Sequence, residues 1–356
     1  MRTILSLILL LLIPVAAVQK PPIRHVFTIV LENKSYSETF GPNSPTPYLS
    51  RYLTSRGALL TNYYAIGHNS LDNYIALISG QAPNAATQGD CQIYQDFIPG
   101  SPVQVDLNGQ VLGQGCVFPP ETQTIADQLT ARQLTWRGYM EDMPAPCTHP
   151  ALNTHDQTQM ARPDNQYAAR HNPFVYFHSI TDAPACANDV PLTQLPSDLQ
   201  RYATTPNYVF ITPNLCHDGH DSPCADGEPG GLASIDAFLQ KWVPQILNSP
   251  AYQRDGLLLI LFDEAEFTGP NADASACCNE LPGPNSPLPG ITGPGGGLVG
   301  AVVLSKYVRP GTITTTPYNH YSILRTIEDL FGLNYLGYAA QDTLSSFDLD
   351  VFIAVP

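Results

Sequence analysis

The chain has 356 residues, with 31 acidic and 16 basic side chains, so its formal net charge is −15 at pH 7. This charge excludes a protein that binds nucleic acid through a basic face, and it argues against electrostatic docking on anionic lipid. Apolar residues make up 43% of the chain, enough for a real core, while 34 prolines and 26 glycines indicate long ordered loops.

The N-terminal segment predicts export. An apolar run extends from Ile4 to Val18, and Val15-Ala16-Ala17 offers small residues to a signal peptidase. The run is short for a membrane span and Pro14 interrupts it, so no stable membrane anchor is expected. We therefore expect a signal peptide over residues 1–17 and a single domain over residues 18–356 of a secreted protein.

Strands and helices are expected to alternate. In chain order, the patterns predict a strand at His25–Leu31, a short helix from Ser70, a helix at Thr124–Gln133, strands at Thr135–Met140 and Tyr208–Thr212, a helix at Leu232–Leu247, a strand at Gly256–Phe262, a loop at Phe267–Gly297, a strand at Leu298–Leu304 and a helix at His320–Phe331. Pro244 should kink or shorten the last turn of its helix.

Several of these strands are continuous apolar runs, which is typical of strands covered on both faces. The fold class is therefore predicted to be α/β, with a mostly parallel sheet sandwiched by helices. In such folds ligands bind beyond the carboxyl ends of the strands.

Eight cysteines follow the N-terminal segment, an even number that predicts disulfides in an exported chain. Neighbours along the chain are candidates for bridges, such as Cys91 with Cys116 and Cys216 with Cys224. The adjacent Cys277-Cys278 either forms a vicinal bridge or pairs elsewhere.

Ser70 stands at the head of an apolar segment that ends at Gly80. A helix N-terminus presents unpaired N–H groups and a partial positive charge, which suit an anionic phosphate. Ser70 is therefore a candidate nucleophile for phosphoryl transfer, although serine is also an ordinary helix cap. Asn73, one turn later, is a candidate donor to a phosphoryl oxygen or simply a polar first-turn residue.

Acidic residues follow two of the predicted buried strands. Glu32 and Asn33 come after the first strand, and Asp263 and Glu264 come after Gly256–Phe262. Either acidic pair alone is also explained by capping of the following turn, but together they predict oxygen ligands for one divalent cation at a shared sheet edge. A cation there would activate a nearby serine hydroxyl.

Histidines supply candidates for proton transfer and phosphate binding. Asp218 and His220 lie in a loop directly after Tyr208–Thr212, His171 precedes an apolar run, and His320 opens the last helix. Each can also be structural: the loop as a solvated polar turn, and the two isolated histidines as caps or packed side chains.

Other catalytic motifs are absent from the sequence. It contains no GxSxG nucleophile elbow, no Walker A motif and no HExxH motif. A GxGxxG pattern at Gly295–Gly300 runs into a strand rather than from a strand into a helix, which argues against a dinucleotide site.

The chain resembles the bacterial phosphoesterase family that includes secreted acid phosphatases and non-specific phospholipases C. The matching segments are Val30–Tyr36, Ser70–Gly80, His171–Phe174, Pro213–Asp221, Phe262–Glu264 and His320–Glu328. The likeness is greatest to compact secreted acid phosphatases that also dephosphorylate phosphoinositides. Two positions of this chain depart from the family pattern. Asp72 stands where relatives commonly carry proline, and His217 stands where they often carry asparagine.

The resemblance implies an alkaline-phosphatase-like core, with Ser70 as nucleophile and phosphate contacts from His171 and His220. It implies that one divalent metal is held by Glu32, Asn33, Ser70, Asp263 and Glu264. We expect Asn73, Asp218 and His320 to complete the substrate site.

The sequence thus predicts a secreted acid phosphatase that hydrolyses a small phosphomonoester or phosphoinositide through a phosphoserine. One alternative is a phospholipase C acting on phospholipids as a phosphodiesterase. The other is a non-catalytic secreted binding protein with the same fold.

Overall fold

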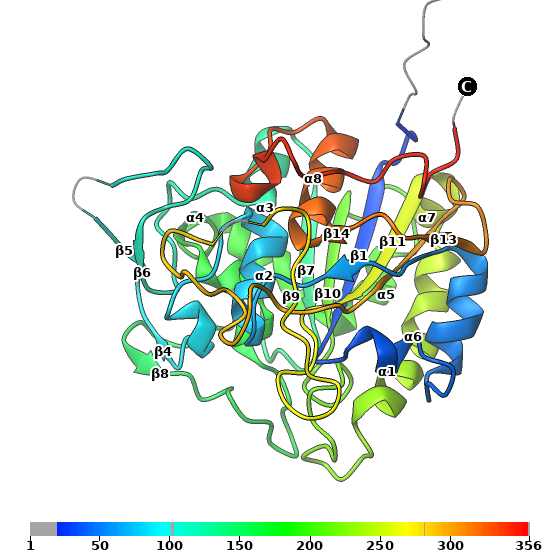
Figure 1. Ribbon diagram of the computed structural model, residues 1–356, viewed down its shortest axis with the longest axis horizontal. Helices are drawn as coiled ribbons and strands as arrows, with labels where there is room; N and C mark the ends of the chain where they lie inside the picture. The colour runs from blue at the N-terminus through cyan, green and yellow to red at the C-terminus, as the bar shows by residue number, and fades with distance from the viewer. Residues whose placement is uncertain (1–19, 101–102, 281, 355–356) are drawn as a thin grey trace, which may run out of the picture.

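The computed structural model of the protein describes residues 20–100, 103–280 and 282–354 (Figure 1). The predicted signal peptide at residues 1–17 lies outside the described residues. One eight-stranded sheet forms the centre. Its strand order is β13 (Thr312–Thr314), β2 (Ala58–Leu60), β12 (Ala301–Ser305), β11 (Gly256–Phe262), β1 (His25–Leu31), β10 (Tyr208–Thr212), β7 (Trp136–Met140) and β9 (Asp189–Pro191).

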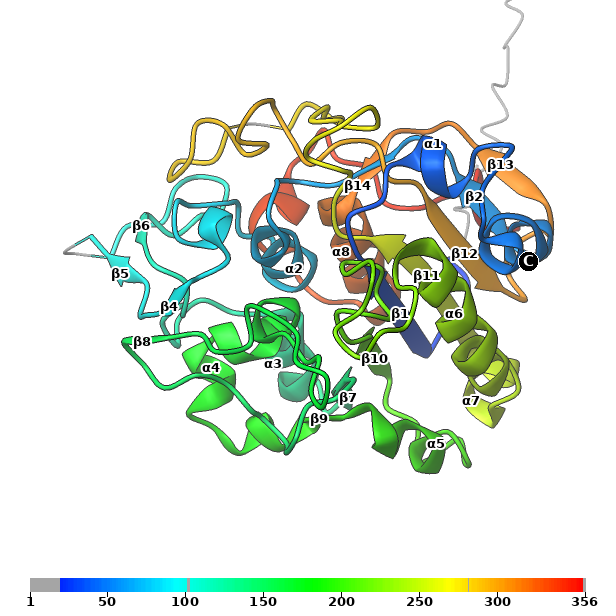
Figure 2. The ribbon, with the colours of Figure 1, turned by 90° about the horizontal axis from the view of Figure 1, so that it is seen from below.

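Helices cover both faces of this sheet, with α6 and α7 on one side and α2, α3 and α8 on the other (Figure 2). The α-helices are α1 (Tyr36–Thr39), α2 (Ser70–Ser79), α3 (Ile125–Ala131), α4 (His178–Thr181), α5 (Leu195–Asp198), α6 (Gly231–Leu247), α7 (Pro250–Asp255) and α8 (His320–Phe331). Three small strand pairs lie outside the sheet: β14 (Tyr318–Asn319) with β3 (Tyr63–Tyr64), β4 (Ile93–Tyr94) with β8 (Thr154–His155), and β5 (Ile98–Pro99) with β6 (Gly113–Gln114).

The predicted α/β class with a mostly parallel sheet is confirmed. Within the eight-stranded sheet, β12 alone runs antiparallel to its neighbours, β11 and β2. Every residue of β1 and β11 is buried, because layers of helices lie on both faces of these central strands. An apolar run therefore signalled burial correctly, but it carries no information about strand direction.

Most predicted element ends lie within two residues of those in the structure, and the start of β12 shows the largest shift. β12 begins at Ala301 rather than Leu298, because Gly300 has a positive φ of 73° and the N–H groups of Val299 and Gly300 both donate to the Tyr63 carbonyl. Pro244 does not shorten α6, which continues to Leu247. The apolar side chains of Val243 and Ile246 are completely buried, and this packing keeps the last turn helical despite the proline.

Four disulfides stabilise the loops: Cys91–Cys116, Cys147–Cys186, Cys216–Cys224 and Cys277–Cys278. The pairings expected between near neighbours are confirmed, and the adjacent cysteines form the vicinal bridge. The segment Phe267–Gly297 contains no helix or strand among its described residues, as expected. It runs from the end of β11 back to β12.

The parallel strands β1, β10 and β11 end at the same edge of the sheet. The chain continues from these strands into Glu32, Pro213 and Asp263, respectively. Since parallel neighbours place the residues after their carboxyl ends together, this edge collects the predicted site residues.

One further buried carboxylate, that of Asp189, lies in β9, the last strand in the sheet order, and is not one of the predicted site residues. Asp189 begins β9, and its Oδ2 accepts a hydrogen bond from the side-chain amide of Asn172 at 2.7 Å. Its Oδ1 is buried and has no hydrogen-bond partner among the described residues. Burial raises the pKa of Asp189 to about 7, although the bond from Asn172 lowers it.

We predict that Asp189→Asn stabilises the protein at neutral pH but not in acid. Folding raises the pKa of this carboxyl from about 4 in the unfolded chain to about 7. The carboxyl therefore lowers the free energy of unfolding progressively as the pH rises between these two pKa values, and the loss is constant at higher pH. The difference in unfolding free energy between variant and wild type should therefore grow from pH 4 to pH 7 by on the order of a few kcal/mol. Urea denaturation across this range measures it, and a difference that does not change with pH contradicts the prediction.

Candidate active site

A buried carboxylate and a serine hydroxyl form the centre of the site. Glu32, directly after β1, is completely buried, and its Oε2 accepts a hydrogen bond from Ser70 Oγ at 2.9 Å. Its Oε1 accepts a second hydrogen bond, at 2.6 Å, from the hydroxyl of Tyr74. Ser70 opens α2 and Tyr74 lies four residues later, so both hydroxyls project from one face of the helix.

The acidic pair after β11 lies beside this centre. Asp263 Oδ1 accepts hydrogen bonds from the backbone N–H groups of Asn33, at 3.0 Å, and Glu264, at 2.6 Å. Its Oδ2 is buried and has no hydrogen-bond partner among the described residues. Glu264 Oε2 accepts from the Asn69 N–H at 3.0 Å and lies 2.6 Å from Nδ1 of the buried His68.

These carboxylates are crowded into a space of low polarity. Burial raises the pKa of Glu32 well above its usual value, and the negative charges of Asp263 and Asp218 raise it further. Burial also raises the pKa of Glu264, and it raises that of Asp263 to about 6. Buried carboxylates that raise one another's pKa in this way are costly unless positive charge offsets them.

The residues present fit a divalent cation. Carboxylate and hydroxyl oxygens are the ligands that hard cations prefer, and the unpartnered Oδ2 of Asp263 is free to bind one. Of the predicted ligands, Glu32 contacts Ser70, while Asn33 and Glu264 contact Asp263 through their N–H groups.

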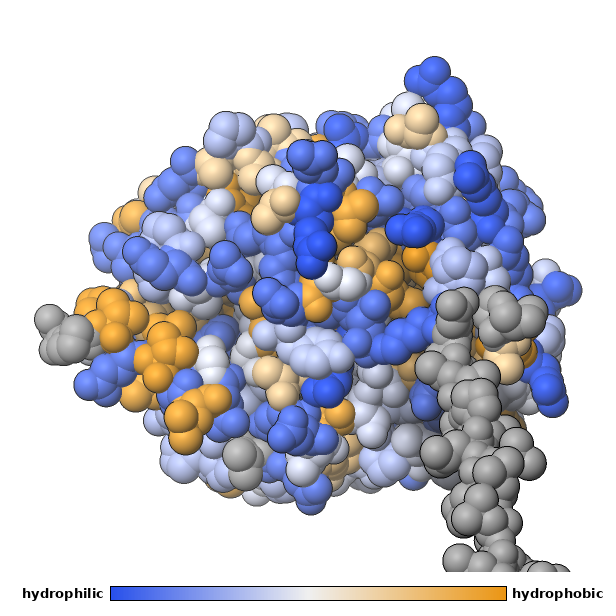
Figure 3. Space-filling view, turned by 90° about the horizontal axis from the view of Figure 1, so that it is seen from above, coloured by the Kyte–Doolittle hydropathy of each residue, from blue (hydrophilic) through white to orange (hydrophobic). Residues whose placement is uncertain are grey.

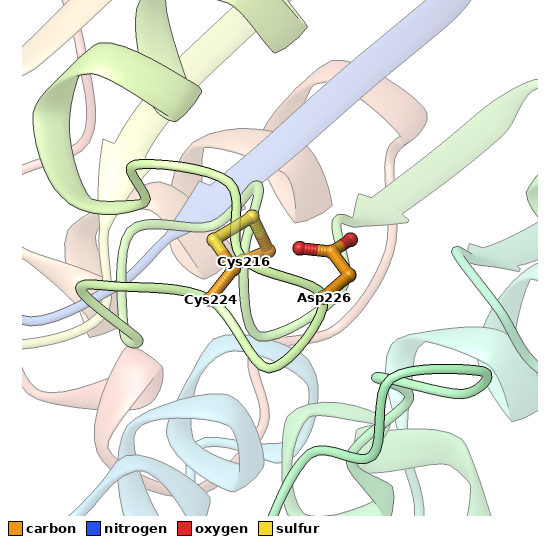
Figure 4. Close-up of side chains that lie close together, drawn as sticks. All are labelled: Cys216, Cys224 and Asp226. Atoms are coloured by element: carbon orange, nitrogen blue, oxygen red, sulfur yellow. A yellow bond between two sulfur atoms is a disulfide. The ribbon is translucent and has the colours of Figure 1, made fainter.

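The structure brings together a second buried group that shares Glu32. One ligand atom each from Glu32, His171 and Asp218 lies within 4.8 Å of the other two. Sequence reasoning assigned His171 and Asp218 to substrate binding, so this set is an alternative cation position. A similar grouping of Cys216, Cys224 and Asp226 offers no thiolate, because the two sulfur atoms are joined in a disulfide (Figure 4).

Asp218, in the loop after β10, holds the two predicted site histidines. Its Oδ2 lies 3.0 Å from His171 Nδ1, and its Oδ1 accepts from the backbone N–H of His220 at 2.8 Å. The His171 ring stacks on Tyr74 and places Nε2 at 3.4 Å from Glu32 Oε1. Burial lowers the pKa of His171 well below its usual value, and the charge of Arg170 lowers it further.

His220 is bound at both ring nitrogens. Its Nδ1 lies 2.7 Å from Asp221 Oδ1, and its Nε2 lies 3.1 Å from an Nη2 donor of Arg170. Because a guanidinium can only donate, Nε2 acts as the acceptor and the proton resides on Nδ1. The side chain is 31% exposed and therefore reaches solvent.

Asn73 and His320 are near the site, but their polar atoms bind the protein. Asn73 Oδ1 accepts from the N–H groups of Ile66 and Gly67, and its Nδ2 donates to the carbonyls of Gly67 and Asn69. The nitrogens of the buried His320 contact the Tyr63 hydroxyl and the Asp263 carbonyl at 2.7 and 2.6 Å. Both residues thus hold site backbone in place, and their direct contact with substrate stays a prediction.

Sequence reasoning missed four residues: His68, Tyr74, Asp90 and Arg170. The spacing of Tyr74 from Ser70 was a usable signal, since residues four apart share a helix face. Arg170 directly precedes His171 and is buried, which its charge did not suggest. Asp90 reaches α2 through a contact that no local pattern encodes: its Oδ1 accepts from the Leu71 N–H at 3.0 Å.

Comparison with known proteins identifies the family. The sequence model of the Phosphoesterase family matches residues 42–334. The chain belongs to the phosphoesterase family. The matched range includes Ser70, the histidines and the acidic pair after β11, while Glu32 and Asn33 precede it.

This phosphoesterase has curated relatives of similar type. A phosphate-repressible acid phosphatase of Penicillium chrysogenum is 27% identical over 91% of the chain and 63% of its own length. An acid phosphatase of Aspergillus fumigatus is 25% identical over 91% of the chain and 58% of its own length, so the chain spans less than two thirds of these fungal relatives. A phosphatidylinositol-3-phosphatase of Mycobacterium tuberculosis is 26% identical over 92% of the chain and 83% of its own length.

Solved structures share the fold of the phosphoesterase. A Vibrio parahaemolyticus protein of the alkaline phosphatase superfamily aligns with a TM-score of 0.52 at 14% identity, over 94% of this chain and 73% of that one. A phosphonate monoester hydrolase from Silicibacter pomeroyi has a TM-score of 0.52 at 12% identity, over 93% and 77%. These likenesses confirm the predicted alkaline-phosphatase-like core.

We predict that Asn73→Ala destabilises the phosphoesterase by about 2–5 kcal/mol, because it leaves buried backbone groups of the turn before α2 without partners. Ser79→Ala is the comparison variant, since it removes two hydrogen bonds at the other end of the same helix, one to the Ile75 carbonyl and one from the Gln81 N–H, against the four that Asn73 makes. Urea denaturation compares them. Equal unfolding free energies for the two variants contradict the positioning role of Asn73.

Proposed function

We propose that the protein is a metal-dependent phosphomonoesterase that uses Ser70 as its nucleophile. The observation that carries the proposal is the Ser70 hydroxyl, which lies at the N-terminus of α2 and donates to the buried carboxylate of Glu32. A helix N-terminus favours an anionic phosphoryl group, and a carboxylate at hydrogen-bond distance can accept the hydroxyl proton.

The metal would be held by Glu32, Asn33, Ser70, Asp263 and Glu264. Two observations support this ligand set: its side chains offer oxygen atoms, and Oδ2 of Asp263 has no hydrogen-bond partner among the described residues. When bound, such a cation would lower the pKa of the serine hydroxyl and screen the negative charge of the phosphate. His68 would fix Glu264 through their 2.6 Å contact, and His320 would fix the Asp263 backbone.

The reaction then proceeds in two displacements. Ser70 Oγ attacks phosphorus and passes its proton to Glu32, while the bond from phosphorus to the ester oxygen breaks and the leaving alcohol takes a proton from solvent water as phosphoserine forms. Water next attacks phosphorus and releases inorganic phosphate and free Ser70. His220 is suited to accept the proton of that water once Arg170 Nη2 turns from its Nε2 to the phosphate, since the lone pair of Nε2 is then available and the side chain is partly exposed.

The proposed substrate is a small phosphomonoester or a phosphoinositide. The names of the fungal acid phosphatases and of the mycobacterial phosphatidylinositol-3-phosphatase support this class. Four disulfides are typical of proteins that fold in an oxidising compartment, which supports secretion. Among the described residues, no helix is both long enough and apolar enough to cross a membrane.

We predict that Ser70→Ala lowers kcat for a phosphomonoester by about 10⁴-fold or more, because the nucleophile is lost. The thermal unfolding midpoint should stay close to that of wild type. Ser79→Ala, a serine lost from the opposite end of α2, is the control and should retain turnover. Near-normal turnover of Ser70→Ala would contradict the mechanism.

We further predict that chelation abolishes hydrolysis and that a divalent cation restores it, because the buried carboxylates need a counter-charge to admit a phosphate dianion. Hydrolysis of p-nitrophenyl phosphate, a phosphoinositide and phosphatidylcholine should be compared with each cation. Turnover of phosphatidylcholine alone would favour the phospholipase C alternative. If no phosphoester is hydrolysed with any cation, the binding-protein alternative holds.

A further inference from the structure

A buried guanidinium lies beside the proposed site without a tight ionic partner. The Arg170 side chain is only 3% exposed. Its Nη1 donates to the Gln159 carbonyl at 3.0 Å and its Nη2 contacts His220 Nε2 at 3.1 Å. The carboxylate within ion-pair range is that of Asp90, at 3.6 Å from Nε, which is too long for a good hydrogen bond.

Arg170 lies centrally among the acidic groups of the site. Its charge lowers the pKa of Glu32, Asp218, Asp90 and Glu264. A buried charge is normally retained only with close partners, so a loosely held guanidinium indicates room for another anion.

Asp90 binds the same groups that a phosphoryl oxygen would use. Its Oδ1 accepts from the N–H of Leu71, the residue after the nucleophile, and its Oδ2 faces Arg170. A free helix N–H and a guanidinium are the donors that recognise phosphate in proteins. His171 adds a third donor or acceptor nearby, since its Nε2 is buried and has no hydrogen-bond partner among the described residues.

We propose that Asp90 is a built-in competitor for the phosphoryl group, and that Arg170 is a phosphate-binding residue which Asp90 occupies between turnovers. This inference rests on the proposed function. The substrate's phosphoryl oxygens take the Leu71 N–H and the Arg170 guanidinium when the Asp90 side chain turns away. The returning carboxylate then repels inorganic phosphate, which limits inhibition by product.

The surroundings of Asp90 permit this movement. The residue follows a 3-10 turn at Thr87–Gly89 and has a positive φ of 53°, and its side chain is 17% exposed. Cys91, next in the chain, is bridged to Cys116, so the backbone is anchored while the side chain has a route to solvent. The contrasting interpretation is that Asp90 only caps α2, in which case its charge has no bearing on phosphate affinity.

The test is inhibition of phosphomonoester hydrolysis by inorganic phosphate, with the full chain and its divalent cation. Asp90→Asn should lower the inhibition constant by about tenfold, and Arg170→Gln should raise it by about tenfold, as expected for one charge-assisted hydrogen bond. Asp127→Asn is the matched control, because Asp127 is a carboxylate in the first turn of α3 whose side-chain hydrogen bonds are with Thr124 and Ser179; its inhibition constant should not change.

A second variant tests the same inference if Asp90→Asn fails to fold. If Asp90→Asn does not fold, Asp90→Ser keeps a hydroxyl acceptor but removes the charge, and it should also lower the inhibition constant. An unchanged or raised constant in a folded Asp90 variant, with wild type active, overturns the inference and leaves the proposed function standing. A wild type that hydrolyses no phosphomonoester with any cation overturns the proposed function and the inference together.

Discussion

The contact between α2 and Glu32 is the interaction on which the rest of the site depends. Two hydroxyls from one helix face, those of Ser70 and Tyr74, donate to the two oxygens of a carboxylate that is fully buried at the end of β1. This contact fixes the start of the helix against the edge of the sheet. It also offsets part of the free-energy cost of burying the Glu32 carboxylate, because each carboxylate oxygen gains a hydrogen bond.

Hydrogen bonds alone do not balance the charge that gathers around this contact. Asp218, Asp263 and Glu264 are buried beside Glu32, and Arg170 is the cation that lowers the pKa of several of them. A phosphate dianion can enter such a site only where positive charge is available. The proposed metal supplies it on the side of Asp263, and Arg170 supplies it on the side of His220. An acidic protein can therefore act on an anionic substrate.

The sequence predicted the parts of the site that local patterns encode. Buried strands followed by acidic residues indicated where Glu32 and Asp263 would meet, since the direction of parallel strands sends their carboxyl ends to one edge. The residues themselves offered His171, His220 and His320 as candidates, and the family resemblance assigned phosphate contacts to His171 and His220. The pairing of Asp90 with Leu71 could not be predicted, because it depends on how a disulfide-bonded loop folds back on α2. The reversed direction of β12 was also hidden, since hydropathy reports burial alone.

The division between fully buried and partly exposed side chains separates two roles within the site. His68, Asn73 and His320 are buried and bind either backbone or the carboxylate of Glu264, so they fix the geometry around Ser70. Asp90 and His220, by contrast, have side chains that are 17% and 31% exposed. In the proposed mechanism, substrate and product must be exchanged on every cycle, whereas the proposed nucleophile, Ser70, must stay in place. The exchangeable contacts therefore belong on the exposed side of the site, where Asp90 can leave Arg170 at little cost in packing.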